Sequence, residues 1–482
     1  MVDSASVMAP FFANQSCDPF TVESKPCTLG NYVVYAVEAE SADDVIATVN
    51  FARKHNIRFV IRNTGHDYLG RSTGAGALSV WTHKLRGIEF KTWKDKDYQG
   101  DAVKLGAGIQ GYDILQAGLA KGKVVVGGEC PTVGIAGGYT QGGGHSALST
   151  SFGLSADNTL EFEVVTADGR LLTASRTKNA DLYWALSGGG PGNYGVVISM
   201  TVKAFPDSHV GAATLSFYSN ENPTATFYEA IDAFHAALPA MVEAGSMVVY
   251  YFTSSFFQIA PLTAYGKTAA EVAAIMAPFI AKLDSMGVKY TSETSQSATY
   301  YEHYDKYFGP LPNGNIKVGI AQYGGRLVPF SAWDNSAAMS AVTRFVAEKG
   351  VTWIGVGTDV SPFAKGKANS VLPAWRKPLV HATLTTEWSF DPAQWDKMID
   401  NQRLMTWEVM PAVEAVTLGS GSYMNEADFQ QPLFQEAFFG SNYLQLLCIK
   451  KKYDPEGFFY ATKAVGSEKW YVANNGRMCK VL

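Results

Sequence analysis

Two side chains able to bond covalently to an electron-poor ring lie inside glycine-rich segments of the chain. His66 falls within residues 62–73, and Cys130 falls within residues 127–158, a segment that contains nine glycines. Glycine at this density weakens helices and strands, but it lets the backbone approach a phosphate or a planar ring closely. Imidazole and thiolate are nucleophiles that can attack such a ring at neutral pH. The two segments therefore predict one cofactor held between two loops.

Simpler interpretations of these residues stay open. A loop histidine more often hydrogen-bonds than reacts, and a buried cysteine more often packs as a small apolar side chain. Among the five cysteines of the chain, Cys17 and Cys27 flank a short proline-containing segment and could close a disulfide loop. Cys448 and Cys479 could form a second disulfide, which would leave Cys130 without a disulfide partner. The alternative is five thiols in a cytosolic enzyme.

The composition indicates a large globular protein. A chain of 482 residues with 47% hydrophobic residues is long enough for two domains. A net charge of −5 and only 17% charged residues argue against a nucleic-acid partner, and no apolar run is long enough to span a bilayer. No metal site is expected. The N-terminus shows no signal peptide, but the sequon that begins at Asn14 and the cysteines indicate a secreted protein whose signal peptide is absent from this sequence.

Strands and helices are expected on both sides of the two loops. Residues 57–62 form a predicted buried strand that runs directly into the loop carrying His66. Ser41 and Asp44 form a predicted capping box at the start of a helix that buries one apolar face. Further elements are expected at 32–39 and 196–205 (strands), at 112–121 and 179–186 (helices), and on both sides of a hairpin turn at 167–169.

After about residue 207 the pattern changes to alternating helices and strands. Together they predict an α+β arrangement, an antiparallel sheet with helices on one side, and a separate domain that covers the cofactor. From about residue 420 the chain is expected to return to the first domain, with a helix at 442–451. Helices are predicted at 224–243, 269–286, 332–349 and 392–415, and strands at 246–259, 316–328, 351–360 and 379–389.

Three motifs give the chain a family resemblance: NTGHDYLGRSTG, GGECPTVGIAGGYTQGGGHS and YLQLLCIKKKYDPEGFF. They resemble the berberine-bridge-enzyme-like branch of FAD-linked oxidases in the vanillyl-alcohol-oxidase superfamily, close to secreted fungal members of the isoamyl-alcohol-oxidase type. The resemblance covers essentially the whole chain. It implies a two-domain α+β fold of the vanillyl-alcohol-oxidase (PCMH) type, with an FAD-binding domain at 1–207 and 421–482 and a substrate-binding domain inserted at 208–420.

The resemblance also implies roles for individual residues. His66 and Cys130 match the residues that bond to the flavin 8α-methyl and C6 positions, so a bicovalently held FAD is expected. Val133 matches the position that controls oxygen access, and valine there favours an oxidase. The remaining positions that match cofactor-binding residues are Asn63, Thr64, Gly65, Tyr68, Gly70 and Ser72 at the pyrophosphate, Gly134, Gly137, Gly138, Gly142, Gly143 and His145 along the ring and ribityl chain, and Asp157, Asn158 and Val197 elsewhere on FAD.

Tyr423 is the expected catalytic residue. It matches the tyrosine of the family's Tyr-x-Asn motif, which faces the substrate beside the flavin, and Asn425 could orient it or touch the flavin edge. A phenol has a pKa of about 10, so Tyr423 can act as a general base near neutral pH only if neighbours lower that pKa. A packing tyrosine is the alternative. Glu426 would point away from Asn425 if both lay on one strand, so we do not expect it to be the base.

The expected activity is oxidation of a small organic substrate. A hydride would pass from an alcohol or another C–H donor to flavin N5, and then to O₂ as H₂O₂. The alternatives are an oxidative cyclase of secondary metabolism, an oligosaccharide oxidase, and a non-redox cyclase or binding protein that retains flavin. The sequence names neither the substrate nor the oligomeric state.

Overall fold

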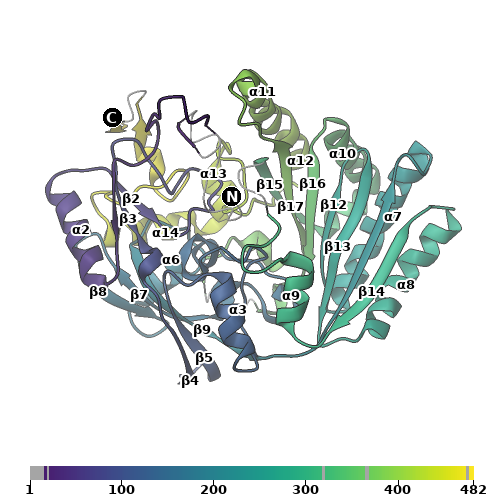
Figure 1. The fold of residues 1–482 in the computed structure, drawn as a ribbon, viewed down its shortest axis with the longest axis horizontal. Coiled ribbons are helices and arrows are strands. Elements are labelled where there is room, and N and C mark those ends of the chain that lie inside the picture. The colour runs from purple at the N-terminus through teal and green to yellow at the C-terminus, as the bar shows by residue number, and fades with distance from the viewer. Residues whose placement is uncertain (1–15, 19–20, 317–320, 364–368, 474–476, 482) are drawn as a thin grey trace.

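A computed structural model describes residues 16–18, 21–316, 321–363, 369–473 and 477–481. The expected glycosylation site at Asn14 lies outside these residues. Two groups of sheets stand beside each other, and the C-terminal segment lies with the N-terminal group (Figure 1). The architecture is α+β, as predicted.

The N-terminal group contains two larger sheets and one two-stranded pair. A three-stranded parallel sheet has the order β1-β3-β2, and a five-stranded antiparallel sheet has the order β4-β5-β9-β7-β8. The strands are β1 (Tyr35–Glu38), β2 (Phe59–Arg62), β3 (Leu78–Trp81), β4 (Ile88–Lys94), β5 (Gln99–Gly106), β7 (Thr159–Val165), β8 (Leu171–Ser175) and β9 (Val196–Lys203), and a separate pair is formed by β6 (Lys123–Val124) and β10 (Phe205–Pro206). The helices are α2 (Ala42–Lys54), α3 (Gly111–Leu119), α4 (Ser149–Phe152), α5 (Ser155–Asn158) and α6 (Ala180–Leu186).

The local signals read from the sequence form as expected in this part. Ser41 caps α2, and Asp44 completes the capping box by accepting from the Ser41 backbone N–H at 3.0 Å. Val45, Val49 and Ala52 are buried on one face of this helix. The predicted hairpin joins β7 to β8. The helix predicted at 179–186 is α6, and the strand predicted at 57–62 is β2.

The central part of the chain forms a seven-stranded antiparallel sheet of order β14-β11-β13-β12-β16-β17-β15. Three long helices, α7, α8 and α10, cover one face of it (Figure 1). The strands are β11 (Val210–Tyr218), β12 (Met247–Phe252), β13 (Phe256–Tyr265), β14 (Thr291–Ser297), β15 (Ala321–Pro329), β16 (Thr352–Thr358) and β17 (Leu379–Glu387). The helices are α7 (Thr224–Glu243), α8 (Ala269–Ser285), α9 (Tyr300–Phe308), α10 (Ser336–Glu348), α11 (Trp395–Leu404) and α12 (Met410–Ala415).

Strand alternation in β17 separates a core face from a second, polar face. Val380, Ala382 and Leu384 belong to the apolar core under the helices. His381 and Thr383 therefore point to the opposite side of the sheet, because successive side chains of a strand alternate. That side meets the C-terminal return, since both residues contact Glu426. The sheet thus presents His381 toward the N-terminal group.

The chain returns to the N-terminal group after α12. The buried Lys450 of α14 ties it there, since its ammonium donates to the carbonyls of Asn193 at 2.6 Å and Phe459 at 2.7 Å. Phe458 also stacks on Phe59 of β2. The elements of this return are α13 (Phe434–Phe439), α14 (Tyr443–Tyr453), β18 (Trp470–Val472) and β19 (Met478–Lys480).

Domain limits at 207/208 and 420/421 remain a proposal. Every strand of the seven-stranded sheet lies between Val210 and Glu387, which agrees with an inserted domain.

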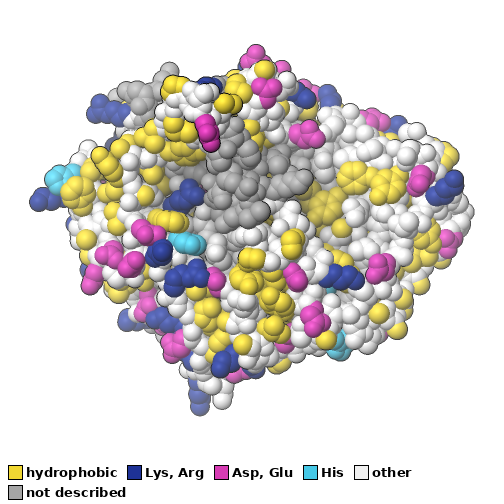
Figure 2. Space-filling model, in the orientation of Figure 1, with side chains coloured by type: hydrophobic (Ala, Val, Ile, Leu, Met, Phe, Trp, Pro, Cys, Tyr) yellow, Lys and Arg dark blue, Asp and Glu magenta, His cyan; other side chains and the backbone are white. Residues whose placement is uncertain are grey.

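Among the described residues, no helix is both long and apolar enough to cross a bilayer. Acidic and basic side chains are interspersed over the face in Figure 2.

One of the two cysteine pairings considered from the sequence forms. Cys17 and Cys27 are joined by a disulfide. The pairing of Cys448 with Cys479 is wrong, since both are free thiols. Cys448 lies on an exposed position of α14, whereas Cys479 lies in β19 and pairs in register with Tyr471. Proximity to the same chain end did not bring the two sulfurs together.

Candidate active site

His66 and Cys130 meet at one hydroxyl group. His66 Nε2 lies 2.7 Å from Thr132 Oγ1, and Cys130 Sγ lies 3.5 Å from the same oxygen. His66 belongs to the loop after β2, and Cys130 to the glycine-rich stretch after β6. The fold therefore brings together two nucleophiles that are 64 positions apart in the chain. Cys130 is buried and is not part of a disulfide.

The loop that carries His66 is shaped by a carboxylate that the sequence analysis did not single out. Asp67 accepts from the backbone N–H groups of Arg71 at 2.6 Å and Ser72 at 3.1 Å. Gly65 and Gly70 have φ of +101° and +74°, which L side chains rarely adopt. The loop holds all the predicted pyrophosphate-binding residues, namely Asn63, Thr64, Gly65, Tyr68, Gly70 and Ser72.

The glycine-rich stretch packs around two asparagine side chains. A Cβ at Gly134 would lie 1.7 Å from Asn63 Oδ1, and a Cβ at Gly142 would lie 2.3 Å from Asn425 Oδ1. These glycines are therefore required by close approach. Asn63 donates to the Ala107 carbonyl at 2.6 Å, while its own buried Oδ1 has no hydrogen-bond donor among the described residues. The other predicted residues of this stretch are Val133, Gly137, Gly138, Gly143 and His145, with Val133 half-buried next to the Cys130 turn.

These features fit FAD. A glycine-lined backbone can approach a planar ring, and the buried Asn63 Oδ1 offers an acceptor for a donor group. His66 and Cys130 supply the two nucleophiles that the resemblance requires.

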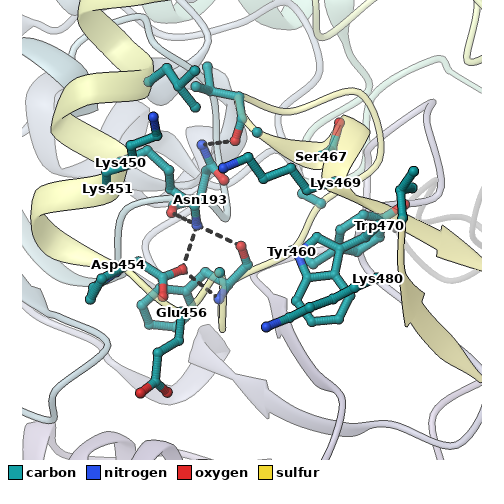
Figure 3. A pocket seen from close by; sticks show the side chains of 18 residues that line it. Asn193, Lys450, Lys451, Asp454, Glu456, Tyr460, Ser467, Lys469, Trp470 and Lys480 are labelled. Carbon is teal, nitrogen blue, oxygen red and sulfur yellow. Dashed lines mark hydrogen bonds and ion pairs between the residues drawn. The ribbon is translucent and has the colours of Figure 1, made fainter.

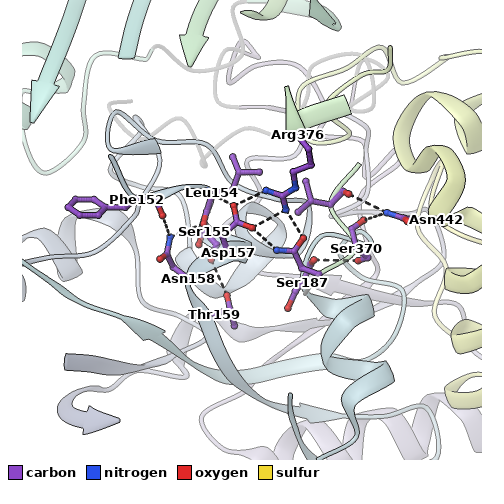
Figure 4. A network of polar contacts seen from close by, with 12 residues as sticks. Phe152, Leu154, Ser155, Asp157, Asn158, Thr159, Ser187, Ser370, Arg376 and Asn442 are labelled. Carbon is purple, nitrogen blue, oxygen red and sulfur yellow. Dashed lines mark hydrogen bonds and ion pairs between the residues drawn. The ribbon is translucent and has the colours of Figure 1, made fainter. Parts of the chain in front are cut away.

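Asp157 lies in a network between the two groups of sheets (Figure 4). Its carboxylate makes a bidentate pair with Arg376, at 2.9 and 3.0 Å, and accepts from the Asn369 amide at 2.7 Å and the Leu154 N–H at 3.0 Å. Because the carboxylate is committed to these partners, a contact with FAD would have to use the Asp157 backbone. The Asn158 side-chain amide likewise donates hydrogen bonds to the Phe152 and Leu154 carbonyls. Val197 is a core residue of β9.

Tyr423 is buried, and its oxygen accepts two hydrogen bonds. The donors are the Gly144 backbone N–H at 3.2 Å and the Asn425 amide at 2.8 Å. Asn425 therefore orients Tyr423, as the sequence suggested. Burial and the nearby Glu426 carboxylate nevertheless raise the pKa of Tyr423 above its ordinary value. The lowered pKa that a phenolate base requires is not found, and with both acceptor positions filled, the phenol is suited to donate its own proton.

Glu426 follows Tyr423 in a turn, so the strand on which it was expected to point away from Asn425 does not form. Residues 423–426 form a turn and not a strand, closed by the Glu426 N–H donating to the Tyr423 carbonyl at 3.0 Å. One carboxylate oxygen of Glu426 lies 2.9 Å from His145 Nε2, and the other lies 2.9 Å from His381 Nε2. Thr383 donates to the same carboxylate at 3.2 Å. The turn therefore places Glu426 beside His145 and His381 in the candidate site.

Opposing charges set the protonation of this cluster. Burial lowers the pKa of His145, but the carboxylates of Glu426 and Glu129 outweigh it and raise that pKa to about 10. Burial opposes ionisation of Glu426, yet the charge of His145 and the hydrogen bonds of both histidines hold the Glu426 pKa well below its usual value. Burial lowers the pKa of His381. At neutral pH the cluster therefore contains an imidazolium at 145, a carboxylate at 426 and a neutral imidazole at 381.

The same three side chains present ligand atoms within 4.8 Å of one another, a spacing that a metal ion could use. Both Nε2 atoms, however, lie at hydrogen-bonding distance from Glu426 oxygens, which requires N–H groups on the histidines. A metal would need those nitrogens deprotonated.

Aromatic side chains from both groups of sheets surround the cluster. Trp375 and His381 both pack edge-on against Tyr423, with ring centroids 5.4 and 5.2 Å from it. Tyr68 stacks on Tyr323 of β15 with centroids 3.7 Å apart. Among the polar residues of the seven-stranded sheet, Tyr251 lies on the same face as His381, whereas Gln322 and Arg326 donate to Met398 and Thr417 on the other side. Gln258 and Glu387 are exposed.

A separate cavity of about 350 Å³ lies between α14 and the β18–β19 hairpin (Figure 3). Lys450 and Asp454 at its wall are fully engaged, because Asp454 also accepts from the Phe458 and Phe459 N–H groups at 2.8 Å. None of the residues described above for the cofactor or the Glu426 cluster lines this cavity. It lies apart from the candidate active site.

Comparison with known proteins agrees with this geometry. A family model described as "FAD binding domain" matches residues 34–175, and one described as "Berberine and berberine like" matches residues 422–466. The chain is 58% identical to FAD-linked oxidoreductase ZEB1 of Gibberella zeae over 99% of this chain and 84% of that protein. It is 48% identical to FAD-linked oxidoreductase patO of Aspergillus clavatus, over 100% and 84% respectively.

A solved structure of a related protein has the same fold. The crystal structure of the VAO-type flavoprotein MtVAO615 from Myceliophthora thermophila superimposes with a TM-score of 0.94 at 41% identity, covering 100% of this chain and 88% of that one. The chain belongs to the berberine-bridge-enzyme-like FAD-linked oxidases of the vanillyl-alcohol-oxidase superfamily. It is an FAD-dependent oxidoreductase, as the sequence predicted.

Proposed function

We propose that this protein oxidises an alcohol group of a small organic substrate, using a bicovalently bound FAD and O₂. The observation that carries the proposal is the convergence of His66 and Cys130 on Thr132, in a family of FAD-linked enzymes. Glucooligosaccharide oxidase from Acremonium strictum, which shares the fold at 19% identity, has a 6-S-cysteinyl, 8α-N1-histidyl FAD. The same two residue types are neighbours here, which supports the bicovalent proposal.

The loop after β2 and the glycine-rich stretch would hold the cofactor. Asn63 would offer its unpaired Oδ1, and the backbone around Gly137 and Gly142 would lie against the ring. When bound, FAD supplies the oxidising power, accepting a hydride from the substrate carbon and reducing O₂ to H₂O₂. Val133, next to Cys130, would leave a path for O₂ to the ring.

Tyr423 would position the substrate. Its oxygen is held by Gly144 and Asn425, so its own O–H can donate to the oxygen of the substrate that carries the reacting C–H bond. This hydrogen bond fixes the orientation of the reacting carbon and strengthens as negative charge develops on the oxygen. Tyr423 thereby keeps the catalytic place expected from the sequence, with a different role.

A secreted location is also part of the proposal. The Cys17–Cys27 disulfide supports it, because disulfides persist in oxidising compartments and are rare in the cytosol. Finding the protein in a reducing compartment with this bond absent would contradict it.

A substrate screen tests the activity and separates the alternatives. Plain alcohols, oligosaccharides and alkaloid-like amines would each be added in air, and H₂O₂ release would be measured. The proposal expects H₂O₂ with an alcohol and an unrearranged carbonyl product. H₂O₂ together with a new ring or bond in the product would favour an oxidative cyclase, and H₂O₂ with sugars alone would favour an oligosaccharide oxidase.

A further inference from the structure

Glu426 is the accessible member of a buried ionic cluster. Its side chain is 27% exposed, whereas His381 is fully enclosed and the side chain of His145 is 8% exposed. A substrate entering beside Tyr423 would therefore meet the carboxylate before either imidazole. The two histidines stand behind it, each 2.9 Å from one of its oxygens.

The parts of this cluster come from three separate stretches of the chain. His145 lies in the glycine-rich stretch, His381 lies on the polar face of β17, and Glu426 lies in the turn after Tyr423. Such an arrangement positions the carboxylate only when the two groups of sheets are in contact. It also buries polar and charged side chains, which costs free energy that an apolar contact between the two groups would not.

We propose that Glu426 is the catalytic carboxylate that receives the substrate hydroxyl proton, and that His145 and His381 are its positioning residues. This inference rests on the proposed alcohol oxidation. The O–H bond of the substrate breaks and its proton joins a Glu426 oxygen, while the C–H bond breaks and its electron pair leaves with the hydride to the oxidant named above. A C=O bond forms, and the proton then leaves through the exposed side of the carboxylate.

A carboxylate of low basicity is sufficient for this step. As hydride leaves the carbon, the hydroxyl becomes a protonated carbonyl, which is a strong acid. The acceptor must therefore be ionised and in place, rather than strongly basic. The cluster provides this condition, because two N–H donors and the charge of His145 keep Glu426 ionised. Tyr423 donates to the same substrate oxygen from the other side.

The expected pH dependence follows from the groups that face Glu426. These are His145 and Glu129 from the glycine-rich stretch, His381 and Tyr323 from the sheet, and Tyr68, Tyr139 and Tyr423. Because the pKa of Glu426 is depressed, wild-type flavin reduction should not fall between about pH 8 and pH 5. Removing the charge of His145 raises that pKa, so a His145→Gln variant should lose rate as the pH falls.

The test measures anaerobic flavin reduction by an alcohol that reduces the wild type. Glu426→Gln should lower the rate constant about 10²- to 10⁴-fold with flavin still bound. Glu414→Gln is the matched control, since this carboxylate on α12 pairs with Arg326 and Gln431 away from the site, and it should leave the rate unchanged. Glu426→Asp, which keeps the charge, should retain more activity than Glu426→Gln and guards against loss of folding.

An infrared difference spectrum between wild type and Glu426→Gln gives a readout independent of turnover. It should contain the ionised carboxylate bands of Glu426 down to pH 5, and in the His145→Gln background those bands should give way to a protonated carboxyl at higher pH. A Glu426→Gln rate within threefold of wild type, or a protonated Glu426 at pH 6, overturns the inference while the oxidase proposal stands. Failure of every alcohol to reduce the wild type overturns the oxidase proposal and the catalytic role together.

Discussion

At the scale of single residues, the proposed mechanism separates substrate positioning from proton acceptance. Tyr423 has both acceptor positions of its oxygen filled and a raised pKa, which supports the proposal that it donates a hydrogen bond to the substrate. Glu426 is ionised, partly accessible and supported by two histidines. His66 and Cys130, the proposed points of flavin attachment, lie around the Thr132 hydroxyl. Each role follows from what the side chain contacts.

The cofactor tethers give the first prediction at this scale. If both covalent bonds exist, acid-precipitated protein stays yellow, and the His66→Ala, Cys130→Ala double variant releases its flavin under the same treatment. Each single variant should keep its flavin attached through the remaining bond, with an altered absorption spectrum. Free flavin in the supernatant of the wild type would rule out covalent attachment.

Tyr423 gives the second prediction. Tyr423→Phe removes the hydroxyl without leaving a large cavity, so flavin should stay bound while its reduction by substrate slows about 10²-fold, the effect of losing one hydrogen-bond donor to a developing charge. Anaerobic stopped-flow absorbance measures this rate. If Tyr423 donates and is not the base, the pH profile of the variant should keep the wild-type shape. An unchanged rate would remove Tyr423 from the catalytic site.

At the scale of elements, turns and alternate strand faces build the site. The sequence motifs predicted the His66 loop, the glycine-rich stretch and most helices of the inserted domain, because caps, glycines and apolar periodicity are local signals. The strand assumed around Glu426 is wrong, because a turn forms there. His381 was overlooked, although the strand predicted at 379–389 would place it opposite Val380 and Ala382. Strand β14 is not predicted from the sequence, because its residues are all polar and lie on the sheet edge.

Long-range contacts account for the rest of what the sequence could not show. Nothing local indicates that Asp157 pairs with Arg376, because 219 positions separate them. The same is true of His145 and Glu426, which are 281 positions apart. These pairs depend on how the two groups of sheets meet, and that requires the folded chain.

The Asp157–Arg376 pair gives the prediction at this scale. Arg376→Ala leaves the Asp157 carboxylate buried with its charge uncompensated, which should lower stability by about 3–5 kcal/mol. The measurement is the denaturant midpoint of the flavin-loaded protein. Arg403→Ala is the control, since Arg403 and Asp400 are 71% and 72% exposed and should change little. Equal midpoints for the two variants would contradict the stabilising role of the Asp157–Arg376 pair.

At the scale of the whole molecule, the candidate active site lies where the two groups of sheets meet. One group supplies the cofactor loops, the other supplies His381 and the sheet face around it, and the C-terminal return supplies Tyr423 and Glu426. Two covalent tethers would keep FAD in place beside a substrate site formed between the groups. The family membership, the fold and this convergence all support an FAD-dependent oxidase.

Anaerobic mixing with candidate alcohols is the most direct test of that conclusion. The account predicts that at least one alcohol bleaches the bound flavin completely, and that admitting O₂ restores the yellow colour with one H₂O₂ formed per flavin. A flavin that dithionite reduces but that no alcohol, sugar or amine bleaches would contradict the account and favour a protein that retains FAD without oxidising a substrate.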